Sequence, residues 1–389
     1  KKLHFSTSVS PAVGKKSIYV IAVGTALNSD GTADYDQIER STDALGGVLA
    51  SGDIVILRST VVVGTTSKLV IPLLEKRSKL KEGEDFYVGF APERTIEGRA
   101  IEELKTLPQI IASNTRVGVE KIENFFSHVA QEVVRVESLE TAELVKLISN
   151  AYRDLSFAFS HSVALAAAEH NVDVNHLIDT ANQGYVRNQI PLPSPGVGGY
   201  CLTKDPYLFA YSGGGENVGL IYELMHAGRN VNKEMPKHVA KLVEIYARQQ
   251  GWKSPCVAVI GLAFKSDPPT SDVRFSPSVD LVNELLARGF TNNLGYDQLV
   301  DDEIFYEFGL ERMDSLVDVV DRADIIVLMH ASERYHDPRA LERLQIKADK
   351  KVLIDTWGMY SEQFKDSERL RYANLSYRSN STNQHHLKV

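Results

Sequence analysis

The chain has 389 residues, of which 43% are hydrophobic and 24% charged, and a formal net charge of −8 at pH 7. That length allows two or three domains of ordinary globular composition. The negative charge argues against a nucleic-acid partner, although a local basic pocket for a phosphorylated small molecule is compatible with it. No apolar run approaches a membrane span and no secretory signal is visible, so we expect no membrane partner and a cytoplasmic location. Because the chain starts at Lys1, not Met, we expect a fragment or a processed chain.

Residues 18–136 alternate strand-like and helix-like segments. The apolar run SIYVIAVG at 17–24 predicts a strand buried on both faces. Further strands are predicted at 53–60 and 85–94, and helices at 34–50 and 65–76. Thr65 or Thr66 is the expected cap of the second helix. This alternation implies right-handed βαβ units and a parallel sheet.

The segment 138–182 is long and mostly helical, and its apolar spacing predicts one long helix that joins two lobes and offers a dimer face. Ser138 is the expected N-cap, with Glu140 in the first turn. Residues 183–217 are rich in Gly, Pro and Ser and are expected to form a loop.

A helix is predicted at 218–249, and from residue 255 the alternation of strands and helices resumes. The segments expected are strands at 255–264, 324–330 and 351–357 and a helix at 277–288. The chain therefore predicts an α/β fold in which two parallel-sheet lobes flank a helical centre.

The chain has two cysteines, Cys201 and Cys256, and this number restricts the metal sites and disulfides that it could form. Their number and spacing fit no zinc motif, so we expect no metal. A disulfide between them is disfavoured in a chain without a secretory signal. From the residues alone, Cys201 is either a nucleophile or a small core residue. The eleven histidines are scattered, and His385 and His386 are expected to be solvated in a polar tail.

Polar residues gather where the predicted strands end, which is where ligands bind in open α/β sheets. Thr60 and Glu93 follow two strands of the first lobe, and Lys265 follows the first strand of the last lobe. Lys146 and Asn150 are four residues apart and share one helix face. Taken singly, none of these signals is specific. Spacing alone favours a solvated helix face for Lys146 and Asn150, and the other residues are compatible with a surface pair or loop charges.

Together these segments resemble one family, the nucleotide-sugar 6-dehydrogenases, which include the UDP-glucose and UDP-N-acetylmannosamine dehydrogenases. The resemblance rests first on the cysteine motif PSPGVGGYCLTKDPY. The other segments, RSTVVVGTT, FAPERTIEG, ETAELVKLISNAYRD and GLAFKSDPPTSDVRFSP, occur in the order of the family, and the resemblance covers about residues 18 to 360. It implies two Rossmann-like domains joined by a long helical connector, NAD as cofactor, a UDP-sugar substrate and a homodimer or larger homo-oligomer. The expected domains are a partial NAD-binding domain at 1–137, a connector with the Cys loop at 138–249, a UDP-binding domain at 250–375 and a tail at 376–389.

The resemblance also implies a chemistry, in which a sugar C6 alcohol is oxidised to a carboxylate through a cysteine thiohemiacetal and thioester. Cys201 would be the nucleophile, Lys146 and Asn150 would hold the substrate oxygen, and Asp205 would orient water and Lys146. Glu93 would be the general base for hydrolysis, and Thr60 would hold the same water. The implied cofactor contacts are Thr25, Thr60, Glu93 and Arg274, and the implied substrate contacts are Lys146, Asn150, Tyr152, Arg187, Gly198 and Lys265.

The sequence departs from the family pattern in several places, which include VGTAL and STVVVGTT, where prolines are expected. No GxGxxG turn for the NAD diphosphate occurs in it, so the first domain is expected to be N-terminally truncated. The segment FSHSVAL carries His161 and Ser162 where an Asn-Glu pair is usual. The substrate implied first is UDP-N-acetyl-D-mannosamine and the second is UDP-glucose. A truncated, non-catalytic UDP-sugar-binding homologue is the remaining alternative.

Overall fold

The structure, a computed structural model, describes residues 3–10, 16–187, 189–214 and 217–378. It divides into two compact units. The first unit comprises Lys1–Tyr152 and Lys204–His226, and the second comprises Arg153–Thr203 and Ala227–Val389. No helix in the described ranges is long and apolar enough to cross a bilayer.

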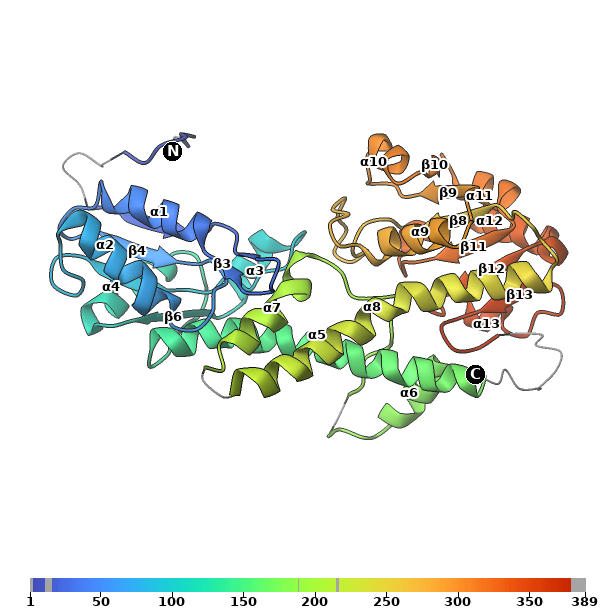
Figure 1. Cartoon of the computed structure of the whole chain (residues 1–389), viewed down its shortest axis with the longest axis horizontal. Coiled ribbons are helices and arrows are strands. Elements are labelled where there is room, and N and C mark those ends of the chain that lie inside the picture. Colours follow the sequence, from blue (N-terminus) through green and yellow to red (C-terminus); the bar gives the residue numbers. More distant parts are fainter. Residues whose placement is uncertain (1–2, 11–15, 188, 215–216, 379–389) are drawn as a thin grey trace. The chain divides into compact units, whose positions relative to one another are not determined.

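The first unit is built on a five-stranded sheet in the order β1-β4-β5-β6-β7, of which Figure 1 labels β4 and β6. Its strands are β1 (Ile18–Ile21), β4 (Ile54–Leu57), β5 (Tyr87–Phe90), β6 (Gln109–Ser113) and β7 (Val133–Arg135). All neighbours pair in parallel except β5 and β6, which are antiparallel, contrary to the uniformly parallel sheet expected from the sequence. A small hairpin, β2 (Ala26–Leu27) and β3 (Ala33–Asp34), precedes the first helix.

Helices cover both faces of this sheet. Successive residues of a strand point to opposite faces, so neighbouring residues of β4 pack against different helices. Val55 and Leu57 of β4 pack with α1 (Asp36–Gly46) and α2 (Ile71–Ser78), whereas Ile54 and Ile56 pack with α4 (Arg116–Phe126). A further helix, α3 (Ala100–Thr106), follows the end of β5.

Two local predictions for the first unit are wrong. The strand at 17–24 is not buried on both faces, because β1 ends the sheet order and its Ile18 and Val20 are exposed. Neither Thr65 nor Thr66 caps a helix with its side chain. The chain instead enters α2 through a π-helical turn at Thr66–Val70. The N–H of Thr66 and that of Gly64, two residues before the turn, donate to the carboxylate of Glu143.

The second unit contains a six-stranded, fully parallel sheet in the order β10-β9-β8-β11-β12-β13. Its strands are β8 (Val257–Ile260), β9 (Asn293–Tyr296), β10 (Glu311–Arg312), β11 (Ile325–Leu328), β12 (Val352–Asp355) and β13 (Arg371–Ala373). One core joins the sheet to α9 (Pro277–Ala287), α10 (Asp302–Glu307) and the long helices, and the other joins it to α11 (Leu316–Arg322), α12 (Pro338–Ile346) and α13 (Ser361–Phe364). Parallel strands buried on both faces give the continuous apolar runs seen in the sequence.

Three long helices contribute residues to both units, namely α5 (Leu139–Glu169), α7 (Tyr200–Tyr211) and α8 (Asn217–Gln249). The Ser138 hydroxyl accepts the Thr141 N–H at 3.1 Å, so this predicted cap is confirmed. The single helix expected over 138–182 is wrong, because the chain turns at Asn171, whose φ is +53°, and α6 (Val174–Asn182) starts from an Asp173 cap. The loop expected over 183–217 is wrong in its second half, which forms α7.

The described chain ends just after β13. Ser376 is buried, and its hydroxyl accepts the N–H of Val174 at 2.8 Å, so the tail expected from residue 376 is anchored at its start. Residues 379–389, including His385 and His386, lie outside the described residues.

His330 is buried in the second unit directly after β11. Its Nε2–H donates to the carbonyl oxygen of Ala263 at 2.9 Å. Gly261, whose φ is +86°, is packed so closely on the ring that an added Cβ would lie 2.5 Å from Nδ1. Burial lowers the pKa of His330 to about 4, so the folded protein holds this ring neutral.

The second unit should therefore lose stability as the pH falls from about 6.5 to about 4, because the unfolded chain binds a proton that the folded chain refuses. Each buried neutral histidine adds a slope of up to about 1.4 kcal/mol per pH unit in that window. His330→Gln, which keeps a donor for Ala263, should flatten the slope, whereas the exposed His176→Gln should not. Urea unfolding at several pH values, followed by the fluorescence of Trp252 and Trp357 in the second unit, measures the pH dependence of the free energy of unfolding. Equal slopes for both variants would contradict the assignment of this pH dependence to His330.

Candidate active site

The cysteine motif lies at the start of α7, and the preceding glycines explain why the helix can begin there. Gly199 has φ +85°, and its N–H donates to the carbonyl oxygen of Phe275 at 3.3 Å. A Cβ on Gly198 would lie 2.2 Å from that same carbonyl oxygen, so a larger residue does not fit without a shift. Thr203 closes the first turn by donating its N–H and hydroxyl to the Gly199 carbonyl oxygen.

This start leaves Cys201 exposed in the first turn of α7. The interpretation of Cys201 as a core thiol is therefore wrong. Cys256 is the buried cysteine, and burial raises the pKa of its thiol. Neither cysteine forms a disulfide, as expected.

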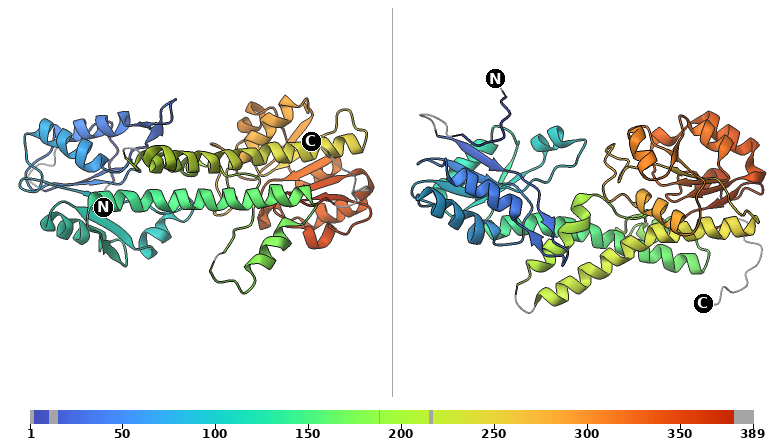
Figure 2. Two further views of the ribbon diagram at one scale, coloured as in Figure 1. Left: turned by 60° about the horizontal axis from the view of Figure 1, so that its bottom comes forward. Right: turned by 45° about the horizontal axis from the view of Figure 1, so that its top comes forward.

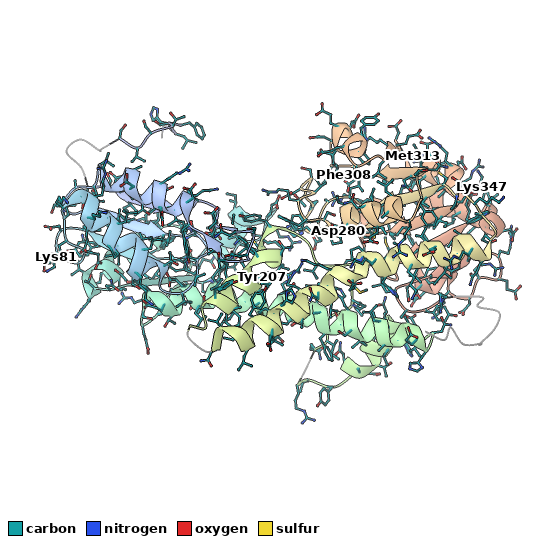
Figure 3. The ribbon with its side chains drawn as sticks, viewed as in Figure 1. Lys81, Tyr207, Asp280, Phe308, Met313 and Lys347 are labelled. Carbon is teal, nitrogen blue, oxygen red and sulfur yellow. The ribbon has the colours of Figure 1, made fainter. Side chains whose placement is uncertain are left out.

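One turn further along α7, Asp205 is fully buried in the first unit. Its Oδ1 accepts a hydrogen bond from the ammonium of Lys204 at 2.6 Å, and its Oδ2 accepts one from the amide Nδ2 of Asn150 at 2.5 Å. The Lys204 side chain is only 8% exposed, so this is an ion pair withdrawn from water. Figure 3 labels Tyr207, two residues after Asp205, and so locates this part of α7.

Lys146 precedes Asn150 by one turn of α5 and is half-buried. Among the described residues it makes no ion pair or hydrogen bond to another side chain. It therefore differs from Lys204, whose charge is matched by Asp205. An ammonium without a carboxylate partner is available to an oxygen of a ligand.

Glu93 and Arg58 follow the carboxyl ends of β5 and β4 and form a salt bridge in the first unit. The second oxygen of Glu93 accepts the N–H of Thr95 at 2.7 Å, and Arg58 also donates to Gln109. Burial acts to raise the pKa of Glu93, but the Thr95 N–H and the Arg58 guanidinium outweigh it and hold the pKa below its usual value. Glu93 is thus a carboxylate at neutral pH.

Thr60 follows β4 and is half-buried, and a buried carboxylate anchors the chain just after it. Glu143 of α5 accepts the N–H of Gly64 at 2.5 Å, the N–H of Thr66 at 2.9 Å and the Thr66 hydroxyl at 2.6 Å. Glu143 is 1% exposed, and burial raises its pKa. Thr25 is buried in the loop after β1, in the same unit.

The remaining candidate residues sit elsewhere in the chain. Gly198, Lys265 and Arg274 belong to the second unit, where the Arg274 guanidinium binds Asp272 at 2.6 Å and lies 5.9 Å from the centre of the Tyr200 ring. Arg187 is exposed in the same unit, and Tyr152 is 75% exposed in the first unit.

The structure brings Asn150 and Asp205 together by a direct hydrogen bond in the first unit, and Cys201 precedes Asp205 by four residues on the same helix. Sequence analysis gave no role to Lys204 or Glu143. Glu143 precedes Lys146 by three residues on the same helix face, so charge spacing was the available signal for Glu143. Lys204 and Asp205 are adjacent in the chain, and adjacent side chains on a helix do not face each other, so spacing did not point to their pairing.

The first unit provides only part of a binding site for a dinucleotide. Thr60 and Glu93 present polar groups at the carboxyl edge of its sheet, where a nicotinamide ring would bind. The N–H groups at the helix start after β4, where a phosphate would otherwise bind, already bind the Glu143 carboxylate. The printed sequence has no GxGxxG turn. The residues present therefore fit the nicotinamide end of NAD and offer no glycine-rich cradle for its diphosphate.

Three domain models of the UDP-glucose/GDP-mannose dehydrogenase family match the chain in order. They are the NAD-binding domain at residues 1–130, the central domain at 140–234 and the UDP-binding domain at 258–362. The chain belongs to this family. It is an NAD-dependent nucleotide-sugar dehydrogenase, with a Rossmann-like α/β fold as expected.

Individual relatives resemble most of the chain. It is 35% identical over 314 residues to a UDP-N-acetyl-D-mannosamine dehydrogenase of Pyrococcus horikoshii, which covers 80% of this chain and 70% of that protein. It is 32% identical over 368 residues to an NDP-N-acetyl-D-galactosaminuronic acid dehydrogenase of Ralstonia solanacearum, covering 92% and 82%. The solved UDP-D-ManNAc dehydrogenase structure from Pyrococcus horikoshii matches with a TM-score of 0.79 and 29% identity over 92% of this chain and 81% of that one.

Asp205→Asn should destabilise the first unit by about 3–5 kcal/mol, because it leaves the buried Lys204 ammonium without this carboxylate. Glu120→Gln is the matched control, since it breaks an ion pair with Arg116 that is exposed, and it should change almost nothing. Hydrogen exchange of first-unit peptides in increasing urea gives both free energies. Equal stability of the two variants would show that the Lys204–Asp205 pair does not hold α7 in place.

Proposed function

We propose that the chain oxidises the C6 alcohol of UDP-N-acetyl-D-mannosamine to the uronic acid, with Cys201 as a covalent nucleophile. Two kinds of support carry the proposal. An exposed cysteine stands on the same helix as Asp205, one turn away, and Asp205 binds Asn150. Several relatives, from Pyrococcus horikoshii, Methanocaldococcus jannaschii and Campylobacter jejuni, are named as dehydrogenases of this sugar nucleotide.

The reaction removes four electrons from C6 and consumes one water. NAD⁺ supplies the hydride acceptor for each of its two oxidations. After the first, C6 is an aldehyde, and the Cys201 thiolate adds to that carbon to form a thiohemiacetal. After the second, C6 is a thioester, and attack by water releases the carboxylate and returns the thiolate. A cysteine thus divides one difficult oxidation into steps that a single site can perform.

Lys146 and Asn150 are proposed to hold the C6 oxygen. The Lys146 ammonium offers a positive charge to the alkoxide that develops as the hydride leaves. Asn150 gives one amide hydrogen to Asp205, so its side chain is oriented before substrate arrives. The role proposed for Asp205 is therefore to position Asn150, in place of the contact with Lys146 expected from the sequence.

Glu93 is proposed as the general base for thioester hydrolysis, acting through water that Thr60 helps to hold. Glu93 is ionised at neutral pH, which lets it accept a proton from that water, and the Arg58 and Thr95 contacts that lower its pKa make it a weaker base than a free glutamate. Thr25, Thr60 and Glu93 are proposed cofactor contacts. The proposed UDP-sugar contacts are Lys146, Asn150, Tyr152, Arg187, Gly198 and Lys265, and Arg274 is proposed to lie near the cofactor or the substrate diphosphate.

The chain is further proposed to form a homodimer or a larger homo-oligomer. Leu144, Ile148 and Tyr152 recur every four residues on α5 and are 37%, 44% and 75% exposed, which makes an apolar stripe in the first unit. Light scattering during size-exclusion chromatography should show an oligomer that Ile148→Glu weakens, and a monomeric parent would contradict this.

A cytoplasmic location is proposed because the Cys201 thiol must stay reduced to act.

Cys201→Ala should abolish uronic acid formation, and Cys201→Ser should stop at the aldehyde or an oxygen-linked adduct, because neither can form a thioester. Cys256→Ser should keep the activity, since that buried thiol has no part in the reaction. Chromatography of the sugar nucleotides after reaction with NAD⁺ measures each outcome, with UDP-glucose run alongside as an alternative substrate. Full uronic acid production by Cys201→Ala would refute the nucleophile, and preference for UDP-glucose would refute only the sugar.

The printed chain should bind NAD weakly while it binds UDP-sugar well. A glycine-rich phosphate turn provides several charge-assisted hydrogen bonds of about 1.5–3 kcal/mol each, so the loss of two weakens binding by a factor of about 10² or more. Isothermal titration with NAD⁺ and, separately, with UDP tests this directly. Micromolar NAD affinity in this 389-residue chain would show that another part of the chain holds the diphosphate.

A further inference from the structure

We infer that His161 is a positioning residue that fixes the turn leading to Cys201. His161 is on α5 in the second unit, is fully buried, and has no part in the chemistry proposed above. Its ring lies between α8 and the segment 194–199, which runs directly into the first turn of α7. The inference rests on the proposed role of Cys201.

The hydrogen bonds of His161 define which nitrogen carries its proton. Asn232 donates its amide Nδ2 to the Asp154 carboxylate at 2.8 Å and to the Asp154 carbonyl oxygen at 3.2 Å, so its Oδ1 faces the ring. The His161 Nδ1–H therefore donates to that Oδ1, at 2.8 Å. Its Nε2 is left as an acceptor, and it receives the backbone N–H of Ser194 at 3.1 Å.

A second buried side chain holds the same turn from α8. Arg229 is 2% exposed, and it pairs with Asp154 at 2.6 Å and donates to the carbonyl oxygen of Val197 at 3.3 Å. Figure 2 shows α5 and α8 side by side, and these contacts join them in the second unit. The network thus runs from Ser194 through His161, Asn232, Asp154 and Arg229 to Val197.

This network fixes the backbone just before the nucleophile. The Ser194 N–H binds His161, the Gly196 carbonyl oxygen accepts the Ser194 hydroxyl at 2.7 Å, and the Val197 carbonyl oxygen binds Arg229. On the other side of the turn the Gly199 N–H binds Phe275. Only one residue, Tyr200, then separates Gly199 from Cys201, so a shift of the turn changes where α7 begins and where the thiol stands.

The Ser194 N–H requires an unprotonated His161 Nε2 as its acceptor, and burial keeps the His161 ring neutral. Burial lowers the pKa of His161 to about 4, so Nε2 remains unprotonated at neutral pH. Loss of the acceptor would leave the Ser194 N–H buried without a partner, which favours a rearranged turn. Because thiolates are stabilised at helix N-termini, a rearranged start of α7 should also lower the reactivity of Cys201.

The test compares His161→Leu and His161→Gln with His238→Leu in the full chain. Gln can place an oxygen near the Nε2 position and accept the Ser194 N–H, whereas Leu cannot. His238 is the matched control, because it is another largely buried histidine of the second unit, but its Nε2 binds the Leu375 carbonyl oxygen. Alkylation of Cys201 by iodoacetamide at pH 7.5, read by peptide mass spectrometry, needs no turnover and so is separable from failure of the proposed activity.

We expect His161→Leu to slow Cys201 alkylation about 3- to 10-fold, as the thiolate loses its helix N-terminus. It should also lower kcat for uronic acid formation at least about 10-fold, with less than about a 3-fold change in KM for the UDP-sugar. His161→Gln should recover most of both, and His238→Leu should alter neither, whatever its thermal stability. Equal alkylation rates in His161→Leu and the parent, or equal losses in His161→Leu and His238→Leu, would overturn the inference.

Discussion

The burial of one carboxylate, Asp205, is the constraint on which the candidate residues of the first unit depend. A carboxylate cannot be withdrawn from water unless its oxygens are matched, and here Lys204 and Asn150 match them. The bond to Asn150 joins α7 to α5, so the residue proposed to hold the substrate oxygen is oriented by the same contact. Lys146 lies one turn away on α5, and no carboxylate in the described part of the chain pairs with its ammonium, whereas Lys204 is paired with Asp205.

In the second unit, α7 begins immediately after a sharp turn, and its cysteine, Cys201, is exposed. Gly198 and Gly199 permit the approach of the Phe275 carbonyl oxygen, and no larger residue fits there without a shift. Buried polar side chains from α5 and α8 hold the preceding residues by their backbone groups. The thiol is therefore accessible, while the backbone that carries it is tied at several consecutive positions.

Much of this fold could be predicted, because buried parallel strands such as β4 and β8 give apolar runs and their helices give regular spacing. The failures have local causes. The α7 helix was missed because Gly199 and Pro206 are usually loop residues, and here the glycine turns the chain into the helix. The run at β1 suggested full burial, but burial depends on neighbours that a single segment does not reveal. Asp205 was recognised from its motif, whereas its partner Lys204 required the packing of α7 to be known.

The most direct test of the account is to trap the covalent intermediate on Cys201. Glu93→Gln removes the proposed base for hydrolysis, so this variant, mixed with saturating NAD⁺ and UDP-N-acetyl-D-mannosamine and quenched in acid, should accumulate the thioester. Peptide mass spectrometry should then find the sugar nucleotide's acyl group on the Cys201 peptide, removable by hydroxylamine and absent from the Cys256 peptide. Continued formation of uronic acid with Cys201 unmodified at every quench time would contradict covalent catalysis by this residue.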